Sequence, residues 1–121
     1  MSDSYDDEYV LSIKSWTEGG FDFTAYKVVD PSTPNDFPGE FDEFEIESFN
    51  SGKWIFAQVT VVCSLLGVRL GYSFCDLIPE GIAGDGEIED AFEIIKEFDM
   101  EQEALIEARE VIEQLSLEEA I

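Results

Sequence analysis

The chain has 121 residues, which suits one domain (residues 1–121), and its 45% hydrophobic content favours a folded chain with a modest core. Against 29 Asp and Glu residues stand six Lys and Arg and no His, so the net charge is −23. A surface this negative repels nucleic acid backbones and anionic membranes, which excludes most direct binding to DNA or RNA. Any partner attracted by charge should be basic or a cation.

The first predicted element is a β-hairpin. The segments YVLSIKSW (residues 9–16) and FDFTAYKVV (residues 21–29) are rich in β-branched and aromatic residues, and a Gly-Gly pair lies between them. We expect four side chains of this hairpin to point toward the core, namely Leu11, Ile13, Tyr26 and Val28.

An acidic and aromatic segment follows a proline-rich connector. Three prolines in DPSTPNDFPG exclude regular structure from residues 30–39. The alternation of Phe44 and Ile46 in the next ten residues, EFDEFEIESF, favours a strand, and the alternative is a short helix that ends at Gly52. We expect the phenylalanines to anchor this segment to the core and its five carboxylates to face outward. These carboxylates are Glu40, Asp42, Glu43, Glu45 and Glu47.

A second hairpin is predicted in WIFAQVTVVCSLLGVRLGYSF, residues 54–74. Its alternate residues from Ile55 to Leu65 are apolar, and a turn at Leu66-Gly67 brings apolar residues of both strands to one face. The predicted pairs are Leu65 with Val68, Cys63 with Leu70, Val61 with Tyr72 and Val59 with Phe74.

The same register places the two cysteines on opposite faces of the hairpin. Cys63 points to the apolar face and Cys75 to the other, and about 16 Å of strand separates Cys75 from the position where a partner would be needed. We therefore expect two free thiols, which suit a reducing cytoplasm.

Helical periodicity begins after Asp85. Apolar residues recur at helical spacing on either side of a break near Asp99, and this pattern predicts either one kinked helix or a pair of helices. An apolar helical face must cover the sheet. The predicted fold is therefore α+β, an antiparallel sheet of at least four strands with the C-terminal helices packed on one face.

The carboxylates of this C-terminal third are closely spaced. From Glu87 to Glu119 there are 13 acids in 33 residues, which in a continuous helix would span about 50 Å with one carboxylate every ~4 Å. One DNA strand carries a phosphate about every 3.4 Å of axis. The predicted helical row consists of Glu89, Glu93, Glu97 and Glu101, continued by Glu103, Glu107, Glu110 and Glu113.

The charge is divided into two acidic arms. Residues 1–52 hold 13 acids and two lysines, and residues 80–121 hold 15 acids, one lysine and one arginine. Residues 53–79 hold one acid and two cations, so the centre is nearly neutral. Although a charge run is usually only a solvated surface, this segregation favours a role for the arms in binding a basic partner.

Catalytic and cofactor-binding patterns are absent from the sequence. Without His, the commonest general base is missing and no imidazole can activate a Ser or Cys nucleophile. The glycines of PEGIAGDGE lack the lysine of a phosphate-binding loop, and DGEIED does not follow the EF-hand spacing. We predict no enzyme activity, no catalytic residue, no cofactor and no metal site.

Two resemblances bear on function. VTVVCSLLGVRLGYSF, followed by the acidic helix containing ALIEAREVIEQL, resembles small uncharacterised acidic proteins encoded by phages and plasmids. Their hairpins more often carry Asp-Gly where this chain has Leu66-Gly67. By size, charge and fold type the chain is also similar to phage DNA-mimic inhibitors of restriction enzymes and CRISPR effectors. The resemblances imply an origin in a mobile element and a counter-defence role.

The sequence thus favours a non-enzymatic DNA mimic that acts in the cytoplasm of a host cell. The predicted partner is a basic nucleic-acid-binding protein, such as a restriction, CRISPR or other nuclease, and the binding residues are the carboxylates of both arms. One alternative is an immunity protein that neutralises a basic nuclease toxin, and another is an acidic scaffold domain. A homodimer is left open, since joined acidic surfaces could cover a longer path.

Overall fold

The computed structural model describes residues 10–82 and 88–120. Five antiparallel strands pair in chain order, so each strand lies beside its sequence neighbours. The α+β prediction, with at least four antiparallel strands and helices on one face, is confirmed. The strands are β1 (Val10–Glu18), β2 (Phe21–Asp30), β3 (Trp54–Leu65), β4 (Val68–Ile82) and β5 (Ile88–Glu89).

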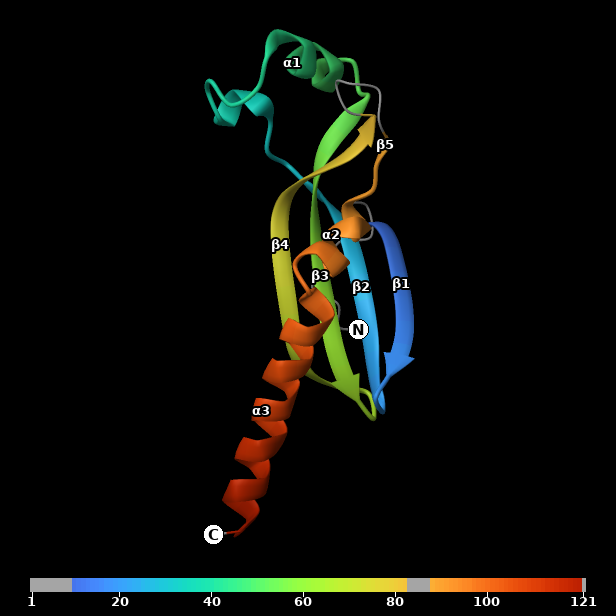
Figure 1. The fold of residues 1–121 in the computed structure, drawn as a ribbon, viewed down its shortest axis with the longest axis vertical. Helices are drawn as coiled ribbons and strands as arrows, with labels where there is room; N and C mark the ends of the chain where they lie inside the picture. The colour runs from blue at the N-terminus through green and yellow to red at the C-terminus, as the bar shows by residue number, and fades with distance from the viewer. Residues whose placement is uncertain (1–9, 83–87, 121) are drawn as a thin grey trace.

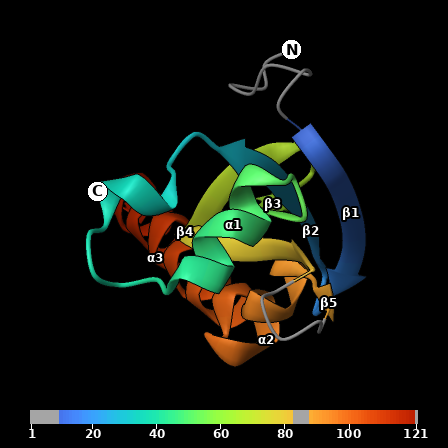
Figure 2. The same cartoon turned by 90° about the horizontal axis from the view of Figure 1, so that it is seen from above.

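The helical segments lie at one end of the sheet and across one face. Figures 1 and 2 show α1 at the end of the long axis, α2 and α3 on one side of the sheet, and the second half of α3 running past the β3–β4 turn. The segments are η2 (Pro34–Asp36), α1 (Glu43–Asn50), η3 (Ala91–Glu93), α2 (Ile94–Glu97) and α3 (Met100–Ala120), where η denotes a 3-10 helix.

The segment EFDEFEIESF forms a helix, so the predicted strand is wrong and the alternative is confirmed. The backbone N–H of Glu45 donates to the Asp42 carboxylate at 2.8 Å, and that of Asp42 donates to the Glu45 carboxylate at 3.0 Å, which together cap the first turn. Gly52, with φ of 79°, follows the last turn in the left-handed conformation that glycine adopts easily. In so short a segment the alternation of two apolar residues suits either element.

Aromatic packing attaches α1 to the sheet. Phe41 and Phe49 lie 5.7 and 5.1 Å from the Trp54 ring, and the Trp54 indole N–H donates to the carbonyl of Glu45 at 3.0 Å. Phe44, by contrast, is 66% exposed. The predicted anchoring therefore holds for two of the three phenylalanines.

The turn of the β3–β4 hairpin is at Leu66-Gly67 as predicted, but the register beyond it is shifted. Leu65 pairs with Val68, after which Leu70 is an extra residue in β4 and bulges. The three further predicted pairs are therefore wrong by one residue. The observed pairs are Cys63 with Gly71, Val61 with Ser73 and Val59 with Cys75.

The shift exchanges the two faces of β4. Gly71, Ser73 and Cys75 share the helix-covered face with Cys63, whereas Tyr72 and Phe74 point to the opposite face, where they are 59% and 54% exposed. The prediction that the cysteines lie on opposite faces is wrong. Both are free thiols, and burial is the main cause that raises the pKa of each.

The core uses a different face of the first hairpin from the one predicted. Phe23 and Ala25 are buried under the helices, and Trp16 stacks on Phe23 with ring centroids 5.5 Å apart. Leu11 and Ile13, predicted to point inward, are 44% and 54% exposed. Tyr26 and Val28 are buried in a smaller cluster with Val62, on the other side of the sheet.

The C-terminal arm consists of several short elements before its long helix. Glu89 belongs to strand β5, so a helix does not begin there as predicted. The break near Asp99 is confirmed, because Asp99 has φ of 54° and separates α2 from α3. Of the two predicted forms, the structure has the helix pair.

Close approach between β4 and α3 depends on small residues. Ala104 and Ala108 of α3 are fully buried, and a Cβ atom added to Gly71 would collide with the carbonyl of Ala104 and lie 2.6 Å from the backbone nitrogen of Ala108. Gly71 therefore sets the distance between the sheet and the helix.

We predict that Gly71→Ala lowers the free energy of unfolding by about 1–3 kcal/mol, because the added methyl group must push α3 away from β4. Urea denaturation monitored by circular dichroism measures this change. Gln102→Ala, on the exposed surface of α3, is the control and should stay within about 0.5 kcal/mol of wild type. Equal stability of Gly71→Ala and wild type would contradict the packing argument.

The turn at Leu66-Gly67 yields a second prediction. Leu66 has φ of 53° and is 92% exposed, so it combines a strained backbone with an unpacked side chain. Leu66→Asn should raise the free energy of unfolding by about 1 kcal/mol, because Asn tolerates the left-handed conformation. Leu66→Ala keeps the strain and should give no comparable gain in the same urea experiment.

Candidate partner-binding surface

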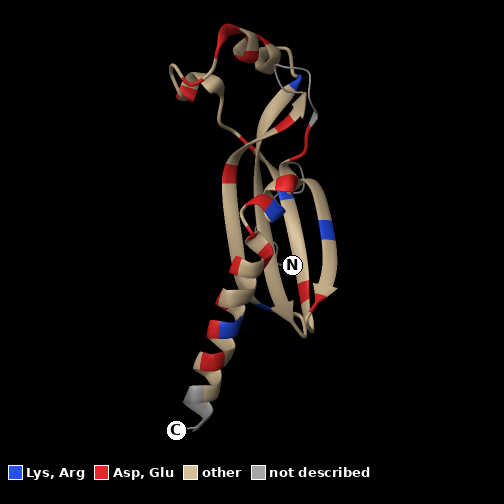
Figure 3. Cartoon of the chain, viewed as in Figure 1, with Lys and Arg blue, Asp and Glu red and all other residues tan. Residues whose placement is uncertain are grey.

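The carboxylates predicted to bind a partner are spread along the length of an elongated molecule. Figure 3 shows Asp and Glu residues on α1 at one end, on the segments around α2 in the middle, and along α3 toward the other end. The two acidic arms therefore do not meet in a single patch. They form instead a discontinuous path parallel to the long axis.

At the α1 end, the five predicted residues divide into structural and free carboxylates. Asp42 and Glu45 are held by the capping hydrogen bonds of α1. Glu40, Glu43 and Glu47 are exposed. Of the five carboxylates, these three take no part in the capping of α1.

In the middle, the structure does not bring the four predicted residues into a helical row. Glu89 is in β5, Glu93 in η3, Glu97 ends α2, and Glu101 lies in the first turn of α3. The prediction of a single stacked row is therefore wrong for these residues. The helical row is interrupted by the left-handed backbone of Asp99 and, before it, by strand β5 and the 3-10 helix η3.

Glu101 also has a structural role that the sequence did not reveal. The indole N–H of Trp16 donates to the Glu101 carboxylate at 2.6 Å, joining the edge strand β1 to the start of α3. A side-chain hydrogen bond with Glu101 and repulsion from its charge raise the pKa of Glu18. Glu18 and Glu101 thus lie close together where β1 meets α3. Because they are far apart in the sequence, no local pattern could have predicted this contact.

On α3, four predicted residues do share one side of a helix. Glu103, Glu107, Glu110 and Glu113 follow one another at spacings of four, three and three residues, and all are exposed. Glu103 accepts a hydrogen bond from the Ser73 hydroxyl at 2.6 Å, which fixes the start of this row against β4. The four carboxylates are spaced by about 5 Å of helix axis on average.

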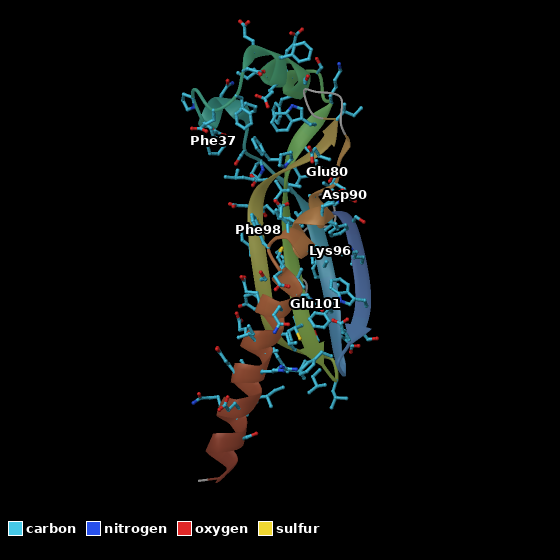
Figure 4. All side chains as sticks on the ribbon, in the orientation of Figure 1. Phe37, Glu80, Asp90, Lys96, Phe98 and Glu101 are labelled. Atoms are coloured by element: carbon cyan, nitrogen blue, oxygen red, sulfur yellow. The ribbon has the colours of Figure 1, made fainter. Side chains whose placement is uncertain are left out.

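A buried cation, Lys27, lies beneath the middle of the acidic path. Lys27 is 6% exposed, and its ammonium group lies 3.2 Å from a Glu80 oxygen and 2.6 Å from an Asp90 oxygen. Figure 4 shows Glu80 and Asp90 close together where β4 and η3 meet. Lys27 also lies over the Phe92 ring, 4.4 Å from its centroid.

The protonation of this cluster follows from its contacts. Burial alone would lower the pKa of Lys27, but hydrogen bonds to Asp90 and Glu80 outweigh it and raise that pKa. The hydrogen bond from Lys27 is the main cause that lowers the pKa of Asp90. Lys27 therefore stays charged at neutral pH, which makes it a structural cation and a poor base or nucleophile.

A cavity of about 400 Å³ lies beside this cluster, and its charged groups are of both signs. Its lining includes Lys14 and Lys96 as well as Asp90, Glu93 and Glu101. Across the part of the chain that the structure describes, no three His, Cys, Asp or Glu residues are grouped so that they could hold a metal ion. The arrangement supports charge pairing between β1, η3, α2 and α3.

Comparisons with protein families, with curated proteins and with solved structures each find no match to this chain. Among the described residues, none of the helices is both long and apolar enough to cross a membrane.

The Lys27 cluster predicts a pH-dependent contribution to stability. Because the pKa of Asp90 in the folded state is lowered from its ordinary value of 3.8, its contribution is present above that pH and is lost as the pH falls below it. We expect Asp90→Asn to unfold about 1 kcal/mol more easily than wild type at pH 6, and we expect this difference to shrink as the pH falls below 3.8.

Urea denaturation at a series of pH values measures this difference. The control is Asp22→Asn, since Asp22 is exposed near the β1–β2 turn and should show little difference at either pH. A difference between Asp90→Asn and wild type that does not shrink in acid would contradict the charge interaction with Lys27.

Proposed function

We propose that this protein is a non-enzymatic inhibitor that binds the basic nucleic-acid groove of another protein by imitating the charge of a nucleic acid. The observation that carries the proposal is the path of carboxylates along the long axis, from α1 to α3 (Figure 3). A groove that accepts a nucleic acid is long and lined with cations. An elongated acidic surface is complementary to it in both shape and charge.

The lack of internal compensation supports this proposal. Lys27 forms two ion pairs with described residues, Glu80 and Asp90, and neither of these is one of the exposed carboxylates of α1 or α3. Like charges on one side of α3 cost about 0.2–0.5 kcal/mol per neighbouring pair, and helix stability does not explain them. A basic partner would turn this repulsion into attraction.

The form of α3 also supports the proposal. The helix has 21 residues, which corresponds to about 31 Å, and its second half extends past the sheet (Figure 1). Its acidic row has about one carboxylate per 5 Å of axis, of the same order as the 3.4 Å spacing of phosphates along a DNA strand. Arg side chains bind carboxylates and phosphates with similar forked geometry, so a groove built for phosphates can accept this row.

Counter-defence is the biological role that this activity suits best. Restriction enzymes, CRISPR effectors and other nucleases all need a basic groove for DNA, and a phage or plasmid benefits when that groove is blocked inside the host cytoplasm. This part of the proposal draws on the resemblance of the chain to small acidic proteins of mobile elements.

A second candidate is an immunity protein that binds a nuclease toxin, and one observation favours it. The sheet face opposite the helices exposes Ile13, Tyr72 and Phe74, all more than half exposed. Exposed aromatic side chains are typical of binding hot spots between proteins. Recognition through this face would not need the carboxylates to enter a DNA groove.

The test begins with capture of binding proteins from a bacterial lysate on the immobilised chain, with elution by salt. The mimic proposal predicts that a purified captured protein loses its DNA when the chain binds. Glu107→Lys with Glu110→Lys should weaken that complex about ten-fold or more, since both side chains are exposed in the α3 row.

The matched control carries the same change of charge outside α1 and α3, as Asp22→Lys with Asp76→Lys, and should weaken the complex less. If the target keeps its DNA in the complex and the α3 variant binds as tightly as the control, the mimic proposal is wrong. Retained DNA combined with loss of binding in Tyr72→Ala and Phe74→Ala would instead favour the immunity candidate.

A further inference from the structure

An aromatic pocket lies between the α1 end of the molecule and the sheet. This aromatic pocket has a volume of about 470 Å³. It is lined by Phe37, Pro38, Glu40, Phe41, Phe56 and Leu77. Phe56 is 3% exposed, and Phe37 and Phe41 stand edge-on to its ring, with centroids 6.0 and 5.8 Å away. Figure 4 labels Phe37 at the outer side of this end.

Hydrogen bonds hold the backbone at one side of the pocket, at Leu77. The N–H of Leu77 donates to the Asp30 carboxylate at 3.2 Å, and Leu77 has φ of 56°, a conformation that a leucine adopts only when its surroundings impose it. Asp30 is buried and also accepts the Ser32 N–H at 3.0 Å. These hydrogen bonds outweigh the effect of burial and lower the pKa of Asp30, so its carboxylate stays charged and continues to hold the Leu77 backbone.

The charged groups around the pocket are mainly acidic, although the exposed Lys53 precedes β3 at the same end of the molecule. Glu40 is the only charged residue in the lining, and it is exposed. In the sequence around it, residues 28–52 contain seven acids and no Lys or Arg. The faces of aromatic rings also carry partial negative charge, so rings and carboxylate together favour a cation.

We propose that the aromatic pocket binds an arginine side chain of the basic partner, as the anchor of the acidic surface at its α1 end. This inference rests on the proposed function for the existence of a basic partner and adds which side chain is recognised and where. The guanidinium group would lie over a phenylalanine ring and donate two hydrogen bonds to the Glu40 carboxylate. The methylene groups of the arginine would contact Leu77 and Pro38.

Arginine fits this pocket better than the other candidates. Lysine is a compact and strongly hydrated point charge, which neither stacks on a ring nor donates two parallel hydrogen bonds. A purely apolar side chain would fill the pocket but gain nothing from Glu40 or from the acidic segment around it. The pocket therefore converts a general attraction for positive charge into a preference for one residue type at one position.

The test uses two synthetic peptides of equal length and charge, in which the cationic residues are all arginine or all lysine. NMR titration of the isotopically labelled protein at low salt gives the affinity and the residues whose signals shift. We expect the arginine peptide to bind about three-fold more tightly than the lysine peptide and to shift the signals of Phe37, Phe41 and Leu77.

Three variants test whether the preference for arginine arises at the aromatic pocket. Glu40→Gln should remove most of the arginine preference, and Phe37→Leu should reduce it while keeping the pocket apolar. Glu43→Gln, an equal change of charge on α1 outside the pocket, should lower the affinity for both peptides by the same small factor. Thermal unfolding confirms that each variant is folded, and the comparison of the two peptides on the wild-type protein needs no variant.

Equal binding of the two peptides, or equal effects of Glu40→Gln and Glu43→Gln, would overturn the arginine pocket. Tighter binding of a third peptide, with leucine in place of its central arginine, would also overturn it and favour an apolar anchor. These outcomes are independent of the capture experiment. The peptide titration can contradict the arginine pocket while the mimic proposal stands, and the capture experiment can contradict the mimic proposal while the arginine preference is observed.

Discussion

The contact on which the rest of the structure depends is the burial of Lys27 between two carboxylates. Lys27 in β2 binds Glu80 in β4 and Asp90 at the start of η3. The same carboxylates accept the backbone N–H groups of Ala91 at 2.7 Å and Phe92 at 2.9 Å. One cation therefore fixes the point at which the chain leaves the sheet and begins its helices, and with it the position of α3. Lys27 is the buried member of this cluster, whereas the Asp90 side chain is 53% exposed.

Part of the fold could be predicted from local patterns, and the rest depends on contacts that no local pattern contains. Both hairpins, the turn at Leu66-Gly67 and the break at Asp99 follow from alternation, glycine and helical spacing. The bulge at Leu70 has no signature in the sequence, and it reversed the predicted faces of β4. The candidate surface was predicted in composition but not in geometry. Trp16 with Glu101, and Lys27 with its two acids, are distant in sequence and are joined only by the fold.

The acids of this protein fall into two groups with different physical roles. One group is held by donors: Asp30 and Asp90 accept backbone N–H groups, and Glu101 accepts the Trp16 indole. The other group consists of exposed carboxylates that repel one another, Glu40, Glu43 and Glu47 at the α1 end and Glu107, Glu110 and Glu113 on α3. Tight packing of Ala104 and Ala108 against Gly71 holds α3 in place despite this repulsion. The scaffold thus fixes the backbone of α1 and of the first half of α3, from which the free carboxylates project.

The bulge at Leu70 also determines which sequence changes the hairpin can accept. With the extra residue, Gly71 lies beneath α3 and Tyr72 faces away from it. Deleting Leu70 would remove the extra residue and still leave Gly71 opposite Cys63, so the residues that face α3 would keep their positions. Deleting Tyr72 instead would shift the rest of the strand by one position and bring the large side chain of Phe74 under the helix. In a lineage of related chains, deletions in this strand should therefore occur at the bulge and not beyond Gly71.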